Sequence, residues 1–170
     1  QKGAVPPPRS FHTMIAVDTS LFVFGGCAAV GRLNDLHRFD TTTNEWETMP
    51  SSDAILGRGG PTLGSGGDGK LYVMTGFAGQ EMNDIHQFSL ATKTWTQLPS
   101  DDLRPRSVCA HCSVQGKIAV FGGEVDISHR GHEGAGAFAN DFLLFDPDTQ
   151  SIDALDVTGA PPMARGWTSM

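Results

Sequence analysis

Three short apolar stretches of the chain share one pattern. Each contains several aliphatic or aromatic residues and ends in glycine: LFVFGG at 21–26, LYVMTG at 71–76 and IAVFGG at 118–123. A polar segment follows each of them, and then a second short apolar stretch such as FLLF at 142–145. Apolar stretches of this length, bounded by glycine and turn residues, are typical of buried β-strands. The pattern therefore predicts an all-β fold, and no stretch has helical periodicity.

These stretches belong to a longer internal repeat. Their last glycines, at positions 26, 76 and 123, lie 50 and 47 residues apart. An Asn-Asp pair follows each glycine, and a phenylalanine stands four positions after each of these aspartates. The first two units then have Trp46 and Trp95, where the third has Ile152. Each unit reads as four antiparallel strands, with Thr-, Asn- and Lys-containing turns between the third and the fourth.

The predicted strands carry apolar residues on both faces, so one unit cannot bury its core alone. We expect the units to stack around an axis as blades of a propeller. The expected blades are residues 1–56, 57–103 and 104–160, the last with an inserted loop at 124–139, and residues 161–170 form the first strand of a further blade. Because propellers usually close with about four to eight blades, further blades or a second copy would complete the ring.

The combination of diglycine, Asn-Asp and a spaced tryptophan resembles the kelch repeat over nearly the whole chain. This resemblance implies a kelch-type β-propeller with blades of about 50 residues. The expected fold is thus a partial propeller, with three four-stranded antiparallel blades and the first strand of a fourth.

Composition narrows the range of partners. Twelve Lys plus Arg against nineteen Asp plus Glu give a formal net charge of −7, so a phosphate backbone would be repelled and nucleic acid is not an expected partner. No apolar stretch approaches the roughly 18 residues that span a bilayer, which predicts no membrane association. Three cysteines are too few for a disulfide framework and favour the cytoplasm or nucleus. Cys109 and Cys112 fall on opposite faces of one predicted strand, which favours buried thiols over metal ligands.

An arginine recurs at the start of each unit. Because strand one begins where strand two ends in an antiparallel pair, these arginines and the loops after strand two should share one mouth of the propeller. A planar guanidinium pairs bidentately with carboxylate, sulfate or phosphate, which predicts a binding site for an anion or an acidic segment. The alternative is a structural role, with the guanidinium groups bonded to blade carbonyls or carboxylates. The residues concerned are Arg9, Arg58, Arg106 and Arg165, with Trp167 as a neighbouring apolar wall.

The third unit carries an insertion on the same side. Its diglycine and Asn-Asp pair are 17 residues apart, against 8 and 7 in the other units. The inserted stretch EVDISHRGHEGAG, residues 124–136, gathers carboxylate and imidazole groups, which are ligands for Zn²⁺ or Fe²⁺. Its glycines instead favour a solvated polar loop. The candidate ligands are Glu124, Asp126, His129 and His132.

Segments of the last hundred residues, including RPRSVCAHCSVQGKIAVFGGEV, GHEGAG and RGWT, are also similar to the C-terminal blades of plant specifier proteins, the nitrile- and epithionitrile-forming family. That resemblance implies Fe²⁺ held by a Glu-x3-Asp-x3-His motif. Glu124 and His132 match the ends of this motif, but Ser128 stands where the family has Asp. One anionic ligand is therefore missing, and Asp126 or His129 would have to replace it.

Three functions remain open. The first is a non-catalytic binding module that holds a protein segment or a small anionic ligand at the mouth. The second is an Fe²⁺-dependent, specifier-like enzyme of the lyase or isomerase type acting on glucosinolate-derived thiohydroximate aglucones, for which Arg9 and Trp167 match the family's substrate contacts. The third is a structural propeller segment of a larger assembly. The binding module is the preferred prediction, because no nucleophile triad, phosphate loop or paired-carboxylate motif stands out.

Overall fold

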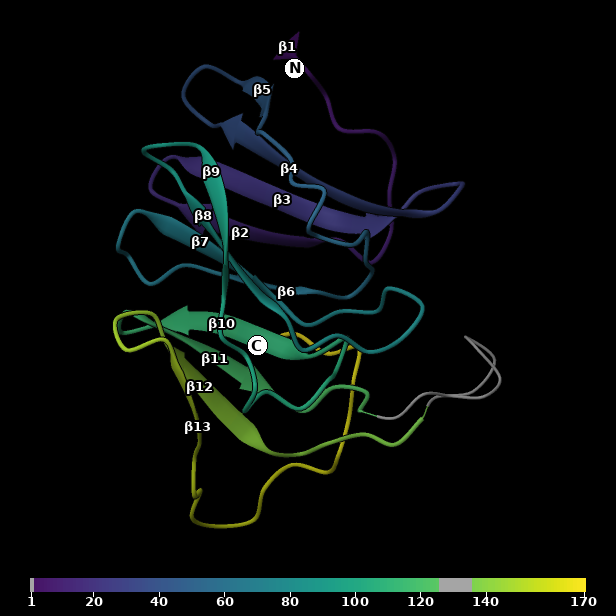
Figure 1. The fold of residues 1–170 in the computed structure, drawn as a ribbon, viewed down its shortest axis with the longest axis vertical. Coiled ribbons are helices and arrows are strands. Elements are labelled where there is room, and N and C mark those ends of the chain that lie inside the picture. Colours follow the sequence, from purple (N-terminus) through teal and green to yellow (C-terminus); the bar gives the residue numbers. More distant parts are fainter. Residues whose placement is uncertain (1, 126–135) are drawn as a thin grey trace.

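Three antiparallel β-sheets follow one another in the order of the sequence (Figure 1). The computed structural model describes residues 2–125 and 136–170. The first sheet has β2 (Thr13–Val17), β3 (Ser20–Cys27), β4 (Arg32–Asp40) and β5 (Glu45–Thr48). The second has β6 (Thr62–Gly64), β7 (Lys70–Met74), β8 (Ile85–Ser89) and β9 (Thr94–Leu98). The third has β10 (Ala110–Val114), β11 (Lys117–Phe121), β12 (Phe142–Asp146) and β13 (Ser151–Ala154).

The predicted all-β architecture of four-stranded antiparallel blades is confirmed. Within each of these three sets of four, every strand pairs with the next one along the chain. The part of the chain that the structure describes holds no helix that could cross a membrane. We call the three sheets blades one, two and three.

Blade one has a fifth strand that the sequence pattern did not predict. This short strand, β1 (Lys2–Gly3), lies parallel to β5, with Lys2 opposite Glu45 and Gly3 opposite Trp46. It covers part of an edge that would otherwise present unpaired backbone groups to another chain. Two residues carry too little pattern to be recognised as a strand from sequence.

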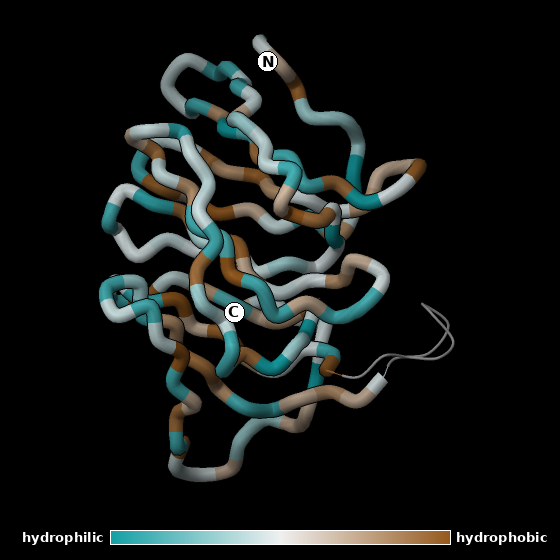
Figure 2. The backbone as a smooth tube through the Cα atoms, viewed as in Figure 1, coloured by the Kyte–Doolittle hydropathy of each residue, from teal (hydrophilic) through white to brown (hydrophobic). Residues whose placement is uncertain are grey.

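The apolar core lies between the blades, where the hydrophobic segments of neighbouring sheets face each other (Figure 2). Successive residues of β7 point to opposite neighbours, as the pleat of a strand requires. Leu71 and Val73 belong to the cluster shared with blade one, whereas Tyr72 and Met74 belong to the cluster shared with blade three. Blade two is therefore buried on both faces, which explains why alternate positions on both faces of its strands are apolar.

The repeated tryptophan packs against the neighbouring blade. The indole of Trp95 lies 4.9 Å from the ring of Phe88 in its own blade and 6.0 Å from that of Phe24 in blade one. Its Nε1 donates a hydrogen bond of 2.8 Å to the carbonyl of Pro50, also in blade one. In blade three Ile152 takes the equivalent place and packs, partly buried, on the cluster between blades two and three.

The diglycines bring backbones together where a side chain would not fit. Gly26 has a φ of +99°, and a Cβ at this position would lie 2.5 Å from the carbonyl oxygen of Ser10. Gly123 has a φ of +96°, and its Cβ would lie 2.6 Å from the carbonyl oxygen of Ser107. Because glycine alone combines this conformation with such an approach, the end of strand two can contact the segment that enters strand one.

Candidate functional site

The loops that follow β3, β7 and β11 lie on one side of the molecule, together with the segments that enter β2, β6 and β10. Isolated backbone bridges connect the two sets of segments, pairing Ser10 with Cys27, Gly59 with Phe77, and Ser107 with Glu124. Figure 1 shows the β3–β4 and β7–β8 connections projecting together from the right of the molecule. We call this side the mouth.

Three of the four repeated arginines are bound to an aspartate of their own blade. The Nη atoms of Arg9 donate to the carboxylate of Asp35 at 2.6 and 2.8 Å, and those of Arg106 donate to Asp141 at 2.8 and 2.9 Å. Arg58 binds Asp84 with the same bidentate geometry. In each case Nη1 also donates, at 3.0 Å, to a carbonyl at the end of strand two: Gly25, Thr75 or Gly122.

This geometry places the three guanidinium groups inside the blades, where they are not open to a ligand. Arg58 is 0% exposed and Arg106 is 1% exposed, and the side chain of Arg9 is 4% exposed. Their bidentate faces, expected to receive an anion, are already occupied by carboxylates. These three arginines therefore adopt the structural role that was the alternative to anion binding: their guanidinium groups bind carboxylates and carbonyls of the blades.

In the sequence, these aspartates were noted only as the second residue of each repeated Asn-Asp pair, and their role as arginine partners was not predicted. A further signal was available, because Arg9 and Asp35 are separated by 26 residues, as are Arg58 and Asp84. In blade three the insertion lengthens this separation to 35 residues and conceals the regularity.

Two histidines complete the buried polar cluster in blades one and two. The Nε2 atoms of His37 and His86 lie 2.7 and 2.8 Å from the carboxylates of Asp35 and Asp84. Burial by itself raises the pKa of Asp84, but the hydrogen bonds from Arg58 and His86 outweigh it and hold that pKa well below its usual range. The carboxylate therefore stays ionised while it binds the arginine.

The backbone of each of these arginines, from the second blade on, is bonded to the preceding blade. The peptide carbonyls of Arg58, Arg106 and Arg165 accept from the N–H groups of Gly26, Gly76 and Gly123 at 2.8, 2.9 and 2.9 Å. Their own N–H groups donate to carbonyls just before the Asn-Asp pair, those of Leu33, Met82 and Ala139. One residue thus connects two blades, through its peptide group on one side and its guanidinium group on the other.

Arg165 reproduces only part of this arrangement. Its peptide group is bonded to blade three, and its Nε donates to the carbonyl of Met163 at 2.9 Å, as each of the other three arginines does to the residue two positions before it. Within residues 2–125 and 136–170, no carboxylate binds its guanidinium group. Of the four predicted arginines, this one is exposed to solvent.

A second repeated feature lies two residues after each arginine. Phe11, Gly60, Val108 and Trp167 all have a positive φ, between 50° and 59°. The N–H of each of the last three donates to the carbonyl of the one before, at 2.8 Å for Gly60 and 2.9 Å for Val108 and Trp167. We call these four residues the left-handed series. A left-handed conformation costs a non-glycine residue about 1–2 kcal/mol, and such strain is concentrated at functional sites.

The left-handed series places aromatic side chains at the mouth. Phe11 is 50% exposed and Trp167 is 53% exposed. The ring of Phe138 contacts Trp167 edge-on at 5.6 Å, and the guanidinium of Arg32 lies 4.8 Å from the ring centroid of Phe77. Trp167 was predicted from the sequence, but the three phenylalanines were not, because residues at turns with no repeated type carry no periodic signal.

Glu124 also lies at the mouth, at the start of the inserted loop. It is 9% exposed, and its Oε1 accepts a hydrogen bond of 2.6 Å from the N–H of Gly136. Burial, reinforced by the negative charge of Glu124, raises the pKa of the nearby Glu81 to about 7. The other predicted ligands, Asp126, His129 and His132, and also Ser128, lie outside the described residues. Within the described ranges, no three His, Cys, Asp or Glu side chains are grouped as metal ligands would be.

The paired and unpaired arginines predict opposite responses to the same substitution. Arg58→Ala should lower the free energy of unfolding by about 3–5 kcal/mol, because it leaves the ionised Asp84 buried without its partner. Arg165→Ala, the matched control from the same repeat position, should change it by less than about 0.5 kcal/mol. Arg58→Lys keeps the charge but loses the planar fork and should fall between them. Urea denaturation measures all three, and equal effects at positions 58 and 165 would contradict the assignment.

Comparisons with known proteins identify the type of repeat. A model of the KLHDC2/KLHL20/DRC7 kelch-repeats domain matches residues 1–123. Kelch domain-containing protein 2 from Bos taurus is 30% identical over 182 residues, covering 99% of this chain and 43% of that protein. Leucine-zipper-like transcriptional regulator 1 from Mus musculus is 46% identical over 59 residues, covering 33% of this chain and 7% of that protein.

A plant relative supports the other resemblance. N-(sulfonatooxy)prop-2-enimidothioate sulfolyase from Thlaspi arvense, a specifier-protein homologue, is 26% identical over 192 residues, covering 99% of this chain and 55% of that protein. The chain therefore spans between 7% and 55% of the length of these three relatives. Because the matching family model covers most of the chain, and the repeated blades agree with it, the chain belongs to the family of KLHDC2/KLHL20/DRC7 kelch-repeat domains.

Proposed function

We propose that this chain is a non-catalytic binding module that holds a segment of a partner protein at its mouth. The observation that carries the proposal is the left-handed series, which holds the half-exposed side chains of Phe11 and Trp167 on a hydrogen-bonded backbone. Exposed aromatic residues on a rigid backbone are typical anchors for a protein partner, because little conformational entropy is lost when they are covered. Membership of the kelch family supports a protein as the partner.

The charges at the mouth favour a protein segment over a small anion. Three of the four arginines are neutralised by aspartates, so within the expected ring of positive charge Arg165 alone has no carboxylate partner among the described residues. The described residues of the mouth also present aromatic surface, with Arg32 over Phe77 and Phe138 against Trp167. A segment with one or two apolar side chains fits this surface better than an inorganic anion, which needs several convergent donors.

This proposal predicts where a selected peptide will bind. Peptides selected from a displayed random library against the folded chain should lose at least about tenfold in affinity for Trp167→Ala and for Phe11→Ala, equivalent to about 1.4 kcal/mol. Val114→Ala, at the exposed last residue of β10 and at the end of blade three opposite the mouth, is the matched control and should change the affinity less than twofold, or by less than about 0.4 kcal/mol. Isothermal titration calorimetry gives these affinities. Peptides that bind equally well to the Trp167 and Phe11 variants would exclude the mouth as the binding surface.

A second candidate function is the Fe²⁺-dependent, specifier-like conversion of thiohydroximate aglucones. Two observations favour it: the sulfolyase resemblance over 99% of the chain, and the position of the Glu124 carboxylate at the mouth. Glu124 would bind the metal through the oxygen not engaged with Gly136, and by the family motif His132 would be a further ligand. Bound Fe²⁺ would supply a Lewis acid for the substrate's sulfur.

Anaerobic iron loading tests this second function. If it is correct, the purified chain should retain stoichiometric Fe²⁺ after desalting, and Ser128→Asp, which restores the family's carboxylate, should retain it more tightly. Glu124→Gln should lose the metal, because a neutral amide replaces an anionic ligand. Elemental analysis measures the iron content. Iron-free protein from both the wild type and Ser128→Asp would remove this function from consideration.

A further inference from the structure

Two carboxyl groups from neighbouring blades lie next to Ser107 at the mouth. Glu81 belongs to the connection between β7 and β8 in blade two, and Glu124 directly follows the diglycine of blade three. The peptide groups of Ser107 and Glu124 exchange hydrogen bonds of 3.0 and 2.9 Å, and the side chain of Ser107 contacts the carboxyl group of Glu81. Ser107 therefore holds the two acidic residues close enough for their charges to interact. We call Glu81 and Glu124 the acidic pair.

Both members of the acidic pair are buried with little to compensate their charge. Glu81 is 8% exposed and Glu124 is 9% exposed. Oε1 of Glu124 accepts a hydrogen bond from the N–H of Gly136, but Oε2 of Glu81 is buried and has no hydrogen-bond partner among the described residues. Within the same residues, no cation forms an ion pair with either carboxyl group. A buried carboxylate without a partner is unfavourable, and the raised pKa of Glu81 reflects this cost.

The equivalent positions of blades one and two hold a favourable pair. Arg32 and Glu81 each stand two residues before the asparagine of the Asn-Asp pair. Phe77 and Glu124 each directly follow the last glycine of the apolar stretch. The guanidinium group of Arg32 lies 4.8 Å from the ring centroid of Phe77, a contact in which cation and ring attract each other. Between blades one and two, this place in the repeat therefore accepts a guanidinium group, whereas between blades two and three it holds two like charges, which repel each other.

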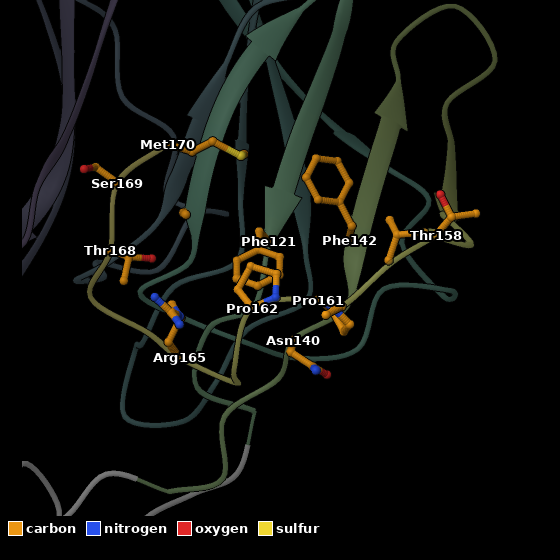
Figure 3. A pocket seen from close by; sticks show the side chains of 13 residues that line it. Phe121, Asn140, Phe142, Thr158, Pro161, Pro162, Arg165, Thr168, Ser169 and Met170 are labelled. Atoms are coloured by element: carbon orange, nitrogen blue, oxygen red, sulfur yellow. The ribbon is translucent and has the colours of Figure 1, made fainter.

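The two arginines bonded to blade three do not supply the missing cation. The guanidinium group of Arg106 is bound to Asp141. Arg165 donates from its Nε to the carbonyl of Met163. Figure 3 shows the side chain of Arg165 among residues that line a groove of about 410 Å³ between blade three and the segment 157–170. Neither guanidinium group is paired with the acidic pair.

We propose that the acidic pair is a binding site for a basic side chain, arginine in preference to lysine, of the protein segment held at the mouth. A planar guanidinium group donates to both carboxylates at once, which offsets their repulsion and supplies the absent hydrogen bond. The net charge of −7 attracts a basic segment over longer distances. The inference rests on the function proposed for the mouth and adds the sign of the partner's charge, which is opposite to the sign expected from the repeated arginines of the sequence.

The acidic pair lies beside the aromatic side chains of the mouth. Phe138 pairs with Glu124 through an isolated backbone bridge, and its ring contacts Trp167 at 5.6 Å. Phe77 pairs with Glu81 in the same way. An extended segment that covers Trp167 with an apolar side chain can therefore place an arginine at the acidic pair. The predicted partner is a segment with an arginine within a few residues of its apolar anchor.

Peptides selected from a displayed random library against the folded chain provide the first test. They should be enriched in arginine and lysine relative to the unselected library. Replacing the arginine of a selected peptide with citrulline, which keeps its shape but removes its charge, should weaken binding to the wild type at least about tenfold. The same replacement should change binding to the double variant Glu81→Gln, Glu124→Gln less than about twofold, because the opposite charge is already absent. Isothermal titration calorimetry measures these affinities.

Two controls separate binding from folding. Glu45→Gln removes the same charge from an exposed side chain at the start of β5, and it should change the affinity less than about twofold. Glu81→Gln should unfold at a urea concentration equal to or higher than that of the wild type, because it removes a buried charge that has no partner. A marked fall in that concentration would assign Glu81 a structural role and would overturn the inference.

A small probe examines the acidic pair without any selected peptide. N-acetylarginine methylamide, added to the EDTA-treated protein, should cause saturable shifts in the carbon-13 NMR resonances of the Glu81 and Glu124 carboxyl groups. N-acetylcitrulline methylamide at the same concentration should leave these resonances in place, and neither compound should shift that of Glu45. Equal effects of the two compounds on the acidic pair would contradict a site that recognises charge.

The results distinguish this inference from the function on which it rests. Selected peptides that need Trp167 and Phe11 but lose less than about twofold with citrulline would refute the basic-side-chain site and leave the mouth function in place. Selected peptides that bind equally well to Trp167→Ala and Phe11→Ala would refute the mouth function, and this inference with it. Stoichiometric Fe²⁺ that the wild type retains and Glu81→Gln loses would also overturn the inference, because the acidic pair would then be a metal site.

Discussion

The bidentate pairing of one arginine with one aspartate in each blade is the interaction on which the arrangement of the blades depends. A buried guanidinium is stable only when its charge is balanced and its N–H groups are bonded, and Asp84 together with the carbonyl of Thr75 meets both needs for Arg58. Because the peptide group of Arg58 is bonded to blade one, the same residue fixes the position of one blade against the next. Because an arginine recurs at this position in each blade, the same contacts set the position of successive blades relative to one another.

This constraint also determines the chemistry of the mouth. Since three guanidinium groups face into the blades, the proposed partner would contact, among the described residues, side chains of the left-handed series and its neighbours. The backbone two residues after each arginine is held in a conformation that only glycine adopts without cost, yet Phe11 and Trp167 stand there. Their exposed rings are the feature on which the proposed binding at the mouth rests.

The blade architecture could be predicted from sequence because it depends on a periodicity that every blade repeats. Glycine-ended apolar stretches, the Asn-Asp pair and the tryptophan each occupy a fixed place in the repeat, so their agreement across units predicts the sheets. The pairing of Arg106 with Asp141 could not be found in this way, because the insertion lengthens the separation of the two residues to 35, against 26 in the other blades. The contact of Phe138 with Trp167 depends on how two loops meet in space, and no local pattern encodes it.

Nitrogen-15 NMR of the arginine side chains tests the central claim most directly, because it reports on each guanidinium group separately. If the bidentate arginine–aspartate pairs are present, Arg9, Arg58 and Arg106 should have resolved Nη resonances, slow rotation about the Nε–Cζ bond and slow hydrogen exchange. Arg165 should have averaged Nη resonances and fast exchange. Averaged resonances and fast exchange for all four arginines would contradict the role assigned to the arginine–aspartate pairs.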